Sequence, residues 1–273
     1  MKKQRIKVKP KKPTRWWTKT RVLYQMSNEK KEATFEEFKS KYFNKAEYDK
    51  YVNELMESDF WKKLSSNRKY NRYHCDSGIN PKAMRNLYAW IRKYKPNVLL
   101  ETGIKHGFST SIFLYALHSN KKGVLISVDS WRDSDRGLYV PKELTKRWIE
   151  IVCPTSLYLP LVDFNIDFFC HDSAHTVKDM TLEYEWALKH MKKGLITSHD
   201  VGTNNAFFDF VKKHNLKWYL VETAAPARFG LGVAEVGVDS SKTMLFNLFS
   251  FITTIYNLIK ELLNNPQSLN KNK

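Results

Sequence analysis

Cysteine is scarce in this sequence, and its spacing builds no recognisable site. The 273 residues contain three cysteines, Cys75, Cys153 and Cys170, and no two of them form a Cys-x-x-Cys pair. Small disulfide-stabilised scaffolds and zinc clusters need closely spaced pairs, so both classes are disfavoured. Widely spaced single thiols suit a reducing compartment. The basic N-terminus is not followed by an apolar stretch of the kind found in secretory signals, so we expect a cytoplasmic protein.

A long apolar run is also missing. Residues 243–259 carry no charged side chain, but they are fewer than the roughly 20 apolar residues of a transmembrane helix. Their polar side chains fall on one narrow helical stripe, which predicts an amphipathic helix with a wide apolar face. Packing on the domain is the default role. Peripheral contact with a membrane surface, or with a second copy of the chain in a homo-oligomer, is the alternative.

Acidic residues are absent from residues 2–21, which carry ten of the 46 lysines and arginines and much of the net charge of +18. Charge blocks of this kind are commonly solvated tails. They can also bind nucleic acid, anionic lipid or an acidic protein, and the pair Trp16-Trp17 favours a binding role. Nucleic acid is therefore kept as a partner through this segment, although it is not the favoured one.

Short apolar strands alternate with helices in the middle of the chain. This alternation predicts an α/β fold with a doubly wound, Rossmann-like, mostly parallel sheet of seven strands. Too few residues separate the last two strands for a crossover helix, so the last strand should be antiparallel. The expected strands span 97–102, 123–130, 147–152, 166–172, 194–200, 217–223 and 229–236.

The sequence divides into four segments by composition and periodicity. A basic flexible tail is expected over 1–30, and a cap or lid of two helices over 31–79. The α/β domain spans 80–238, and residues 239–273 hold the C-terminal amphipathic helix and a tail.

The turn after the first strand carries the main chemical signal, E-T-G-I-K-H-G-F-S-T from residue 101. Gly103 and Gly107 allow a tight turn and a close backbone approach, and Ser109 or Thr110 can cap the helix that follows. The spacing G-x-x-x-G differs from the G-x-G-x-x-G of dinucleotide folds. The acid Glu101, two residues before the first glycine, disfavours a pyrophosphate and favours a ligand that carries an ammonium group.

A second acid, Asp129, ends the second strand. An acid at this position can accept hydrogen bonds from a ribose diol. A cofactor with ribose hydroxyls, an amino group and no phosphate is S-adenosylmethionine (SAM). The two acids therefore favour SAM over a nicotinamide or flavin dinucleotide.

Residues 80–238 resemble the class I SAM-dependent methyltransferases, and are most similar to the small-molecule and sugar O-methyltransferases of the catechol and antibiotic-biosynthesis type. The turn from residue 101 is similar to that family's cofactor motif, and S-V-D-S at 127–130 to its ribose-binding strand end. The resemblance also extends over 166–201. It implies SAM as the cofactor and places a residue such as Ser156 against the adenine ring. The cofactor-binding residues would be Glu101, Gly103, Gly107, Ser109, Asp129 and Ser156.

The resemblance further implies a divalent cation at the ends of the fourth and fifth strands. Asp172, Asp200 and His199 match the positions that hold Mg²⁺ in the metal-dependent branch. His199 stands where that branch has a carboxylate, and Mg²⁺ prefers oxygen ligands. Mn²⁺ or Fe²⁺ would accept the imidazole, or His199 would be a general base without any metal. His175 matches the family's histidine and is the second candidate for a catalytic base.

We therefore expect methyl transfer from SAM to a hydroxyl of a small molecule, sugar or glycan. The loop after the fourth strand lacks the Pro-Pro-aromatic motif of amino-methylating DNA enzymes. The alternative is a catalytically silent Rossmann-like domain whose basic arm binds nucleic acid, with an affinity that falls as salt rises.

Overall fold

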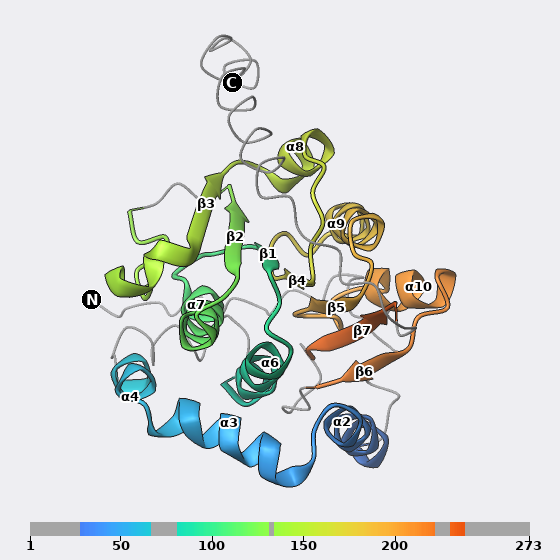
Figure 1. The fold of residues 1–273 in the computed structure, drawn as a ribbon. Helices are drawn as coiled ribbons and strands as arrows, with labels where there is room; N and C mark the ends of the chain where they lie inside the picture. The colour runs from blue at the N-terminus through green and yellow to red at the C-terminus, as the bar shows by residue number, and fades with distance from the viewer. Residues whose placement is uncertain (1–27, 67–80, 131–133, 222–229, 238–273) are drawn as a thin grey trace, which may run out of the picture.

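The computed structural model describes residues 28–66, 81–130, 134–221 and 230–237 (Figure 1). The basic segment 2–21 and the amphipathic segment 243–259 lie outside these residues, so the expectations for both stay untested. Within the described ranges, no helix combines the length and the apolar character that a membrane crossing requires.

The centre of the fold is one sheet of seven strands in the order β3-β2-β1-β4-β5-β7-β6. Neighbouring strands from β3 to β5 pair in parallel, whereas β7 runs antiparallel to both β5 and β6. The predicted α/β sheet with a reversed last strand is thereby confirmed. The strands are β1 (Val98–Thr102), β2 (Val124–Asp129), β3 (Trp148–Val152), β4 (Phe168–His171), β5 (Gly194–Ser198), β6 (Trp218–Leu220) and β7 (Gly232–Val236).

The direction of winding reverses between β1 and β4. The chain moves outward from β1 to β2 and β3, and then returns to place β4 on the other side of β1. In open α/β sheets, ligands bind beyond the carboxyl ends of the strands at such a reversal. The segments that follow Thr102, Asp129, His171 and Ser198 therefore meet at the edge where a site is expected.

Helices cover both faces of the sheet. Successive side chains of a strand point to opposite faces, and both faces are apolar, so both must be covered. In β1, Leu99 packs in one hydrophobic core, while Val98 and Leu100 pack in the other. The first core also contains residues of α6 and α7, and the second contains residues of α9 and α10. These helices are α6 (Pro81–Tyr94), α7 (Phe108–Asn120), α9 (Val177–Lys189) and α10 (Ala206–Lys213). Two short turns of helix, α8 (Thr155–Tyr158) and η3 (Leu159–Leu161), and the 3₁₀ segment η2 (Lys142–Arg147) lie in the connections.

Among the residues that the structure describes, three helices precede α6, where the sequence indicated two: α2 (Asn28–Tyr42), α3 (Lys45–Glu57) and α4 (Asp59–Ser66). They form an outer layer against α6 and β6 (Figure 1). Phe38 and Leu55 are fully buried in the same core as α6 and α7. The remaining part of the predicted cap, residues 67–79, lies outside the described ranges.

A buried carboxylate on β7 joins the outer layer of helices to the sheet. Glu235 on β7 is almost fully buried and accepts a hydrogen bond of 2.7 Å from the Tyr42 hydroxyl. Lys41 forms an ion pair with the other oxygen of the same carboxylate. Because a buried charge must be paired to be tolerated, this contact fixes α2 on the last strand.

Removal of this carboxylate tests the contact. Glu235→Ala leaves a buried Tyr42 hydroxyl and a lysine without their partner, so the free energy of unfolding should fall by about 2–4 kcal/mol. Urea denaturation followed by circular dichroism measures the change. The control is Glu36→Ala, which removes an exposed pair with Lys39 and should cost less than about 0.5 kcal/mol. Equal stability of the two variants would contradict the assignment.

Candidate functional site

Glu101 lies at the end of β1 and is completely buried. Its Oε1 accepts a hydrogen bond of 2.5 Å from the Ser109 hydroxyl. Its Oε2 accepts from the hydroxyls of Thr110 at 2.7 Å and Ser127 at 2.9 Å. Burial raises the pKa of Glu101 to about 7, against the opposing effect of these three hydroxyls. In this arrangement, Glu101 holds the start of α7 against β1 and β2.

The hydroxyls of Ser109 and Thr110 are therefore not helix caps, as the sequence had suggested. The N-cap of α7 is Gly107, which has a left-handed backbone and no side-chain cap. The two hydroxyls turn inward to Glu101, because a buried carboxylate must be hydrogen-bonded to be tolerated.

Asp129 at the end of β2 holds the loop between β1 and α7, residues 103–107, which we call the cofactor loop. One carboxylate oxygen of Asp129 accepts hydrogen bonds from the backbone N–H groups of Ile104 at 2.6 Å and Lys105 at 2.9 Å. The acid that the sequence marked as a ribose contact thus lies directly beside this loop, and also shapes it.

Gly103 lies against the backbone of Asp172, at the end of the neighbouring strand β4. Its φ is +90°, and a Cβ added there would lie 2.1 Å from the carbonyl oxygen of Asp172. No side chain fits at that distance, so glycine is required by the packing of two loops as well as by the turn. The cofactor loop and the segment after β4 therefore share one rigid contact.

Gly107 meets the segment after β2 in the same way. A Cβ at Gly107 would lie 2.8 Å from a methyl group of Val140. The N–H of Gly137 donates to the carbonyl of Lys105, and the N–H of Tyr139 donates to the carbonyl of His106. Residues 137–140 therefore form one wall of the cofactor loop, which the sequence did not indicate.

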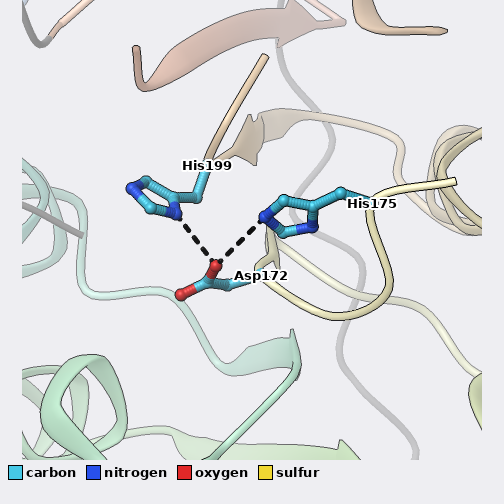
Figure 2. A group of neighbouring side chains, drawn as sticks. All are labelled: Asp172, His175 and His199. Atoms are coloured by element: carbon cyan, nitrogen blue, oxygen red, sulfur yellow. Dashed lines mark hydrogen bonds and ion pairs between the residues drawn. The ribbon is translucent and has the colours of Figure 1, made fainter. Parts of the chain in front are cut away.

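Four side chains gather at the ends of β4 and β5, and we call them the acid–histidine cluster: Asp172, His175, His199 and Asp200. Nδ1 of His199 lies 2.9 Å from Oδ1 of Asp172 and 3.2 Å from Oδ1 of Asp200. Nε2 of His175 lies 3.0 Å from Oδ2 of Asp200 and 3.7 Å from Oδ1 of Asp172. Figure 2 shows the two imidazole rings directed at the Asp172 carboxylate from different loops. The four residues that the sequence predicted at the carboxyl ends of β4 and β5 are therefore neighbours in the structure.

Local backbone geometry produces the cluster. The N–H of Asp172 donates to the carbonyl of Thr102, and the N–H of His199 donates to the carbonyl of His171, so both residues continue their strands by one position. Asp200 then adopts a left-handed backbone with φ of 55°, which acids tolerate better than most residues. This turn brings its carboxylate back beside both rings.

The charges of the cluster are mutually stabilised. Although burial by itself raises the pKa of Asp172, the charge of His199 and its hydrogen bond hold that pKa below its ordinary value. Burial by itself lowers the pKa of His175, but the hydrogen bond to Asp200 and the charge of Asp172 raise it above its ordinary value. The side chains of Asp172, His175 and Asp200 are about 20% exposed, so a solute can reach them.

A second buried acid, Glu183 on α9, was missed by the sequence reasoning. It is fully buried and accepts four hydrogen bonds. Its donors lie in three segments, β1, α8 and the end of β4 with the residues after it: Thr102 at 2.6 Å, Thr155 at 2.6 Å, His171 at 2.6 Å and Ser173 at 2.7 Å. The signal was present in the helix pattern, because Glu183 falls on the apolar stripe of α9. An acid on a buried face needs partners.

Ser156 occupies a different environment from the other predicted cofactor residues. It is exposed on α8, immediately after Thr155. The contact of Thr155 with Glu183 fixes this short helix to α9. Ser156 is thus presented at the surface near the end of β3.

The role of Glu183 predicts a specific loss of stability. Glu183→Gln replaces two acceptor oxygens by one oxygen and an amide donor that faces other donors, so unfolding should be easier by about 3 kcal/mol. His171 and the hydroxyls hold the pKa of Glu183 below its ordinary value, against the effect of burial. The stabilisation is therefore present above the ordinary glutamate pKa and should disappear as the pH falls through the lowered one.

Urea denaturation at neutral and at acidic pH measures both effects. Glu185→Gln, on the same helix but paired at the surface with Lys213 and His214, is the matched control and should change stability little. A Glu183→Gln protein as stable as wild type at neutral pH would exclude the role assigned to this network.

Comparison with known proteins agrees with this geometry. Residues 100–201 match the family model described as a methyltransferase domain. An O-methyltransferase from Bacillus cereus in complex with SAH has a TM-score of 0.52 at 14% identity, covering 69% of this chain and 96% of that one. An O-methyltransferase from Streptomyces achromogenes involved in tomaymycin synthesis, in complex with SAM, has a TM-score of 0.50 at 16% identity, covering 77% and 99%. The comparison with curated proteins gives no match.

The matched residues contain the cofactor loop, Asp129 and the whole acid–histidine cluster. At these identities the solved structures establish the fold alone. Residues 100–201 therefore match a methyltransferase domain in sequence, and the chain has the fold of these solved O-methyltransferases.

Proposed function

We propose that this chain transfers the methyl group of SAM to a hydroxyl group of a small molecule, a sugar or a glycan. The observation that carries the proposal is the acid–histidine cluster, which lies beside the cofactor loop through the contact of Gly103 with Asp172. A hydroxyl acceptor must lose its proton as the new carbon–oxygen bond forms, and the cluster supplies groups that can take it. Both solved structures named above are O-methyltransferases, which supports this class of acceptor.

The cofactor would lie along the carboxyl ends of β1 and β2. The residues present fit it, because glycines shape the loop and Asp129 stands at the strand end where a ribose diol can donate to it. In our proposal, Gly103, Gly107 and Asp129 line the cofactor. Ser156 would face the adenine. Glu101 and Ser109 act indirectly, since their polar atoms already bond to each other and hold α7 in place.

The acceptor hydroxyl would lie between the cofactor and the cluster. Transfer breaks the bond from sulfur to methyl carbon, forms the bond from the acceptor oxygen to that carbon, and releases the hydroxyl proton. His175 and His199 are the proposed proton acceptors, and each ring is paired with a carboxylate that stabilises its charged form. Alignment of the three reacting atoms would supply much of the remaining rate enhancement.

The set Asp172, Asp200 and His199 is also proposed to hold a divalent cation. When bound, such an ion would stabilise the negative charge that develops on the acceptor oxygen. The alternative function, a catalytically silent domain with a nucleic-acid-binding arm, is not favoured by the methyltransferase family match.

Substitution of a loop glycine tests the cofactor assignment. Gly103→Ala forces the cofactor loop away from Asp172, so SAM affinity should fall by at least about tenfold and the thermal shift with SAM should be lost. Gly237→Ala is the matched control, because its added Cβ would lie 1.8 Å from the carbonyl oxygen of Lys192 at the opposite edge of the sheet. It should destabilise the fold but leave SAM affinity close to wild type. Calorimetric titration gives both affinities.

A transfer assay tests the reaction itself. Purified protein with radiolabelled SAM should label acceptors that carry a phenolic or sugar hydroxyl, and should not label matched methyl ethers. Asp172→Asn should reduce the rate by about 10²-fold or more, since it removes the charge that both rings share. Asp209→Asn, an exposed change on α10, should leave the rate unchanged. Absence of any SAM binding would refute the proposed function.

A further inference from the structure

The acid–histidine cluster has the donor set of a metal site that the family resemblance does not describe. The resemblance pointed to Asp172, Asp200 and His199, which would be mainly an oxygen site. In the structure, one ligand-type atom each from Asp172, His175 and His199 lies within 4.8 Å of the others. His175 thus joins the set, and nitrogen atoms outnumber the oxygen of Asp172.

The distances between these ligand atoms fit the binding of a single metal ion. Metal–ligand bonds of about 2.0–2.1 Å place neighbouring ligand atoms about 3.0 Å apart at a right angle and about 3.4 Å apart at a tetrahedral angle. Oδ1 of Asp172 lies 2.9 Å from Nδ1 of His199 and 3.7 Å from Nε2 of His175. Small rotations of the Asp172 and His175 side chains, which are partly exposed, would bring the three atoms onto a common centre.

Two further atoms indicate that the cluster is incomplete as it stands. Oδ1 of Asp200 and Nδ1 of His175 are buried and have no hydrogen-bond partner among the described residues. Buried polar atoms without partners are costly. Oδ1 of Asp200 also lies 3.2 Å from Nδ1 of His199, so a cation beside the rings would give this oxygen a partner.

The chemistry of the donors selects the ion. Mg²⁺ and Ca²⁺ prefer carboxylate, carbonyl and water oxygens, whereas imidazole nitrogen suits Zn²⁺, Fe²⁺, Co²⁺ and Ni²⁺. Two histidines and one carboxylate that leave open positions form the ligand pattern typical of non-haem Fe²⁺ sites. The donor set therefore does not fit a magnesium site.

We infer that Asp172, His175 and His199 bind a nitrogen-preferring divalent transition-metal ion, with Asp200 as a fourth ligand or as the acceptor of a hydrogen bond from metal-bound water. This inference rests on the proposed function only for the location of the acceptor. A ring nitrogen that binds an ion is not available as a base, so the loaded and metal-free clusters would remove the acceptor proton differently. Metal binding must therefore be measured directly.

The experiment uses the full chain, without an affinity tag, after removal of metal with a chelator. Co²⁺ is added and the visible absorption of its d–d bands is recorded, and calorimetry with Zn²⁺, Mn²⁺ and Mg²⁺ gives affinities and stoichiometry. We expect one Co²⁺ per chain with nitrogen-containing coordination, and Zn²⁺ affinity at least about 10²-fold higher than Mg²⁺ affinity.

Single substitutions identify the ligands. His175→Ala, His199→Ala and Asp172→Asn should each weaken Zn²⁺ binding by at least about tenfold and change the Co²⁺ spectrum. His214→Ala removes a histidine that pairs with Glu185 at the surface, and should change neither. Circular dichroism confirms that each variant is folded.

Three results would overturn the inference: no binding of any transition ion at 0.1 mM (about the weakest affinity usual for a functional site), Mg²⁺ binding as tight as Zn²⁺ binding, or unchanged binding in His175→Ala. SAM binding and methyl transfer in the presence of chelator are measured separately. If both persist while no ion binds, only this inference fails. If SAM does not bind while the ion does, only the proposed function fails.

Discussion

The close approach of Gly103 to the backbone of Asp172 is the constraint on which the rest of the site depends. Two parallel strands end side by side, and the loops that follow them must diverge unless one has no side chain. With glycine at 103, the two loops stay in contact, and the residues that shape the cofactor loop and those of the acid–histidine cluster belong to one rigid unit. The position of the cofactor loop relative to the acid–histidine cluster is thus set by main-chain packing, which varies less than side-chain rotamers do.

Buried acids organise the surroundings of this contact. Glu101 holds the start of α7 through three hydroxyls, and Glu183 holds the ends of β1 and β4 together with α8. Each acid gathers donors from segments that are distant in sequence. The interior around the site is therefore held by directional hydrogen bonds. It differs in this from the apolar packing that secures α6 and α10. Such networks specify one arrangement, because any shift of a segment leaves a buried oxygen unpaired.

The sheet was predictable from the sequence, because apolar strands and helical stripes report which faces are buried. The acids Asp129, Asp172 and Asp200 could also be read from the sequence at the ends of strands, and the edge of the parallel sheet brings Asp172 and Asp200 together. The side-chain hydrogen bonds between separate elements were not predictable. Periodicity says that Ser109 lies on a helix, but cannot say that its hydroxyl turns inward to Glu101, since that bond depends on two elements packing at a particular depth.

The link between α2 and β7 has a consequence for how the chain is made. Tyr42 and Glu235 are 193 residues apart, so the helix that leaves the ribosome among the first meets its buried partner only when the last strand has emerged. Until then α2 lacks the acid that fixes it, and the reversed strand that completes the sheet also completes the outer helical layer. Among the described strands, the one that is translated last is thus also the one that fixes α2.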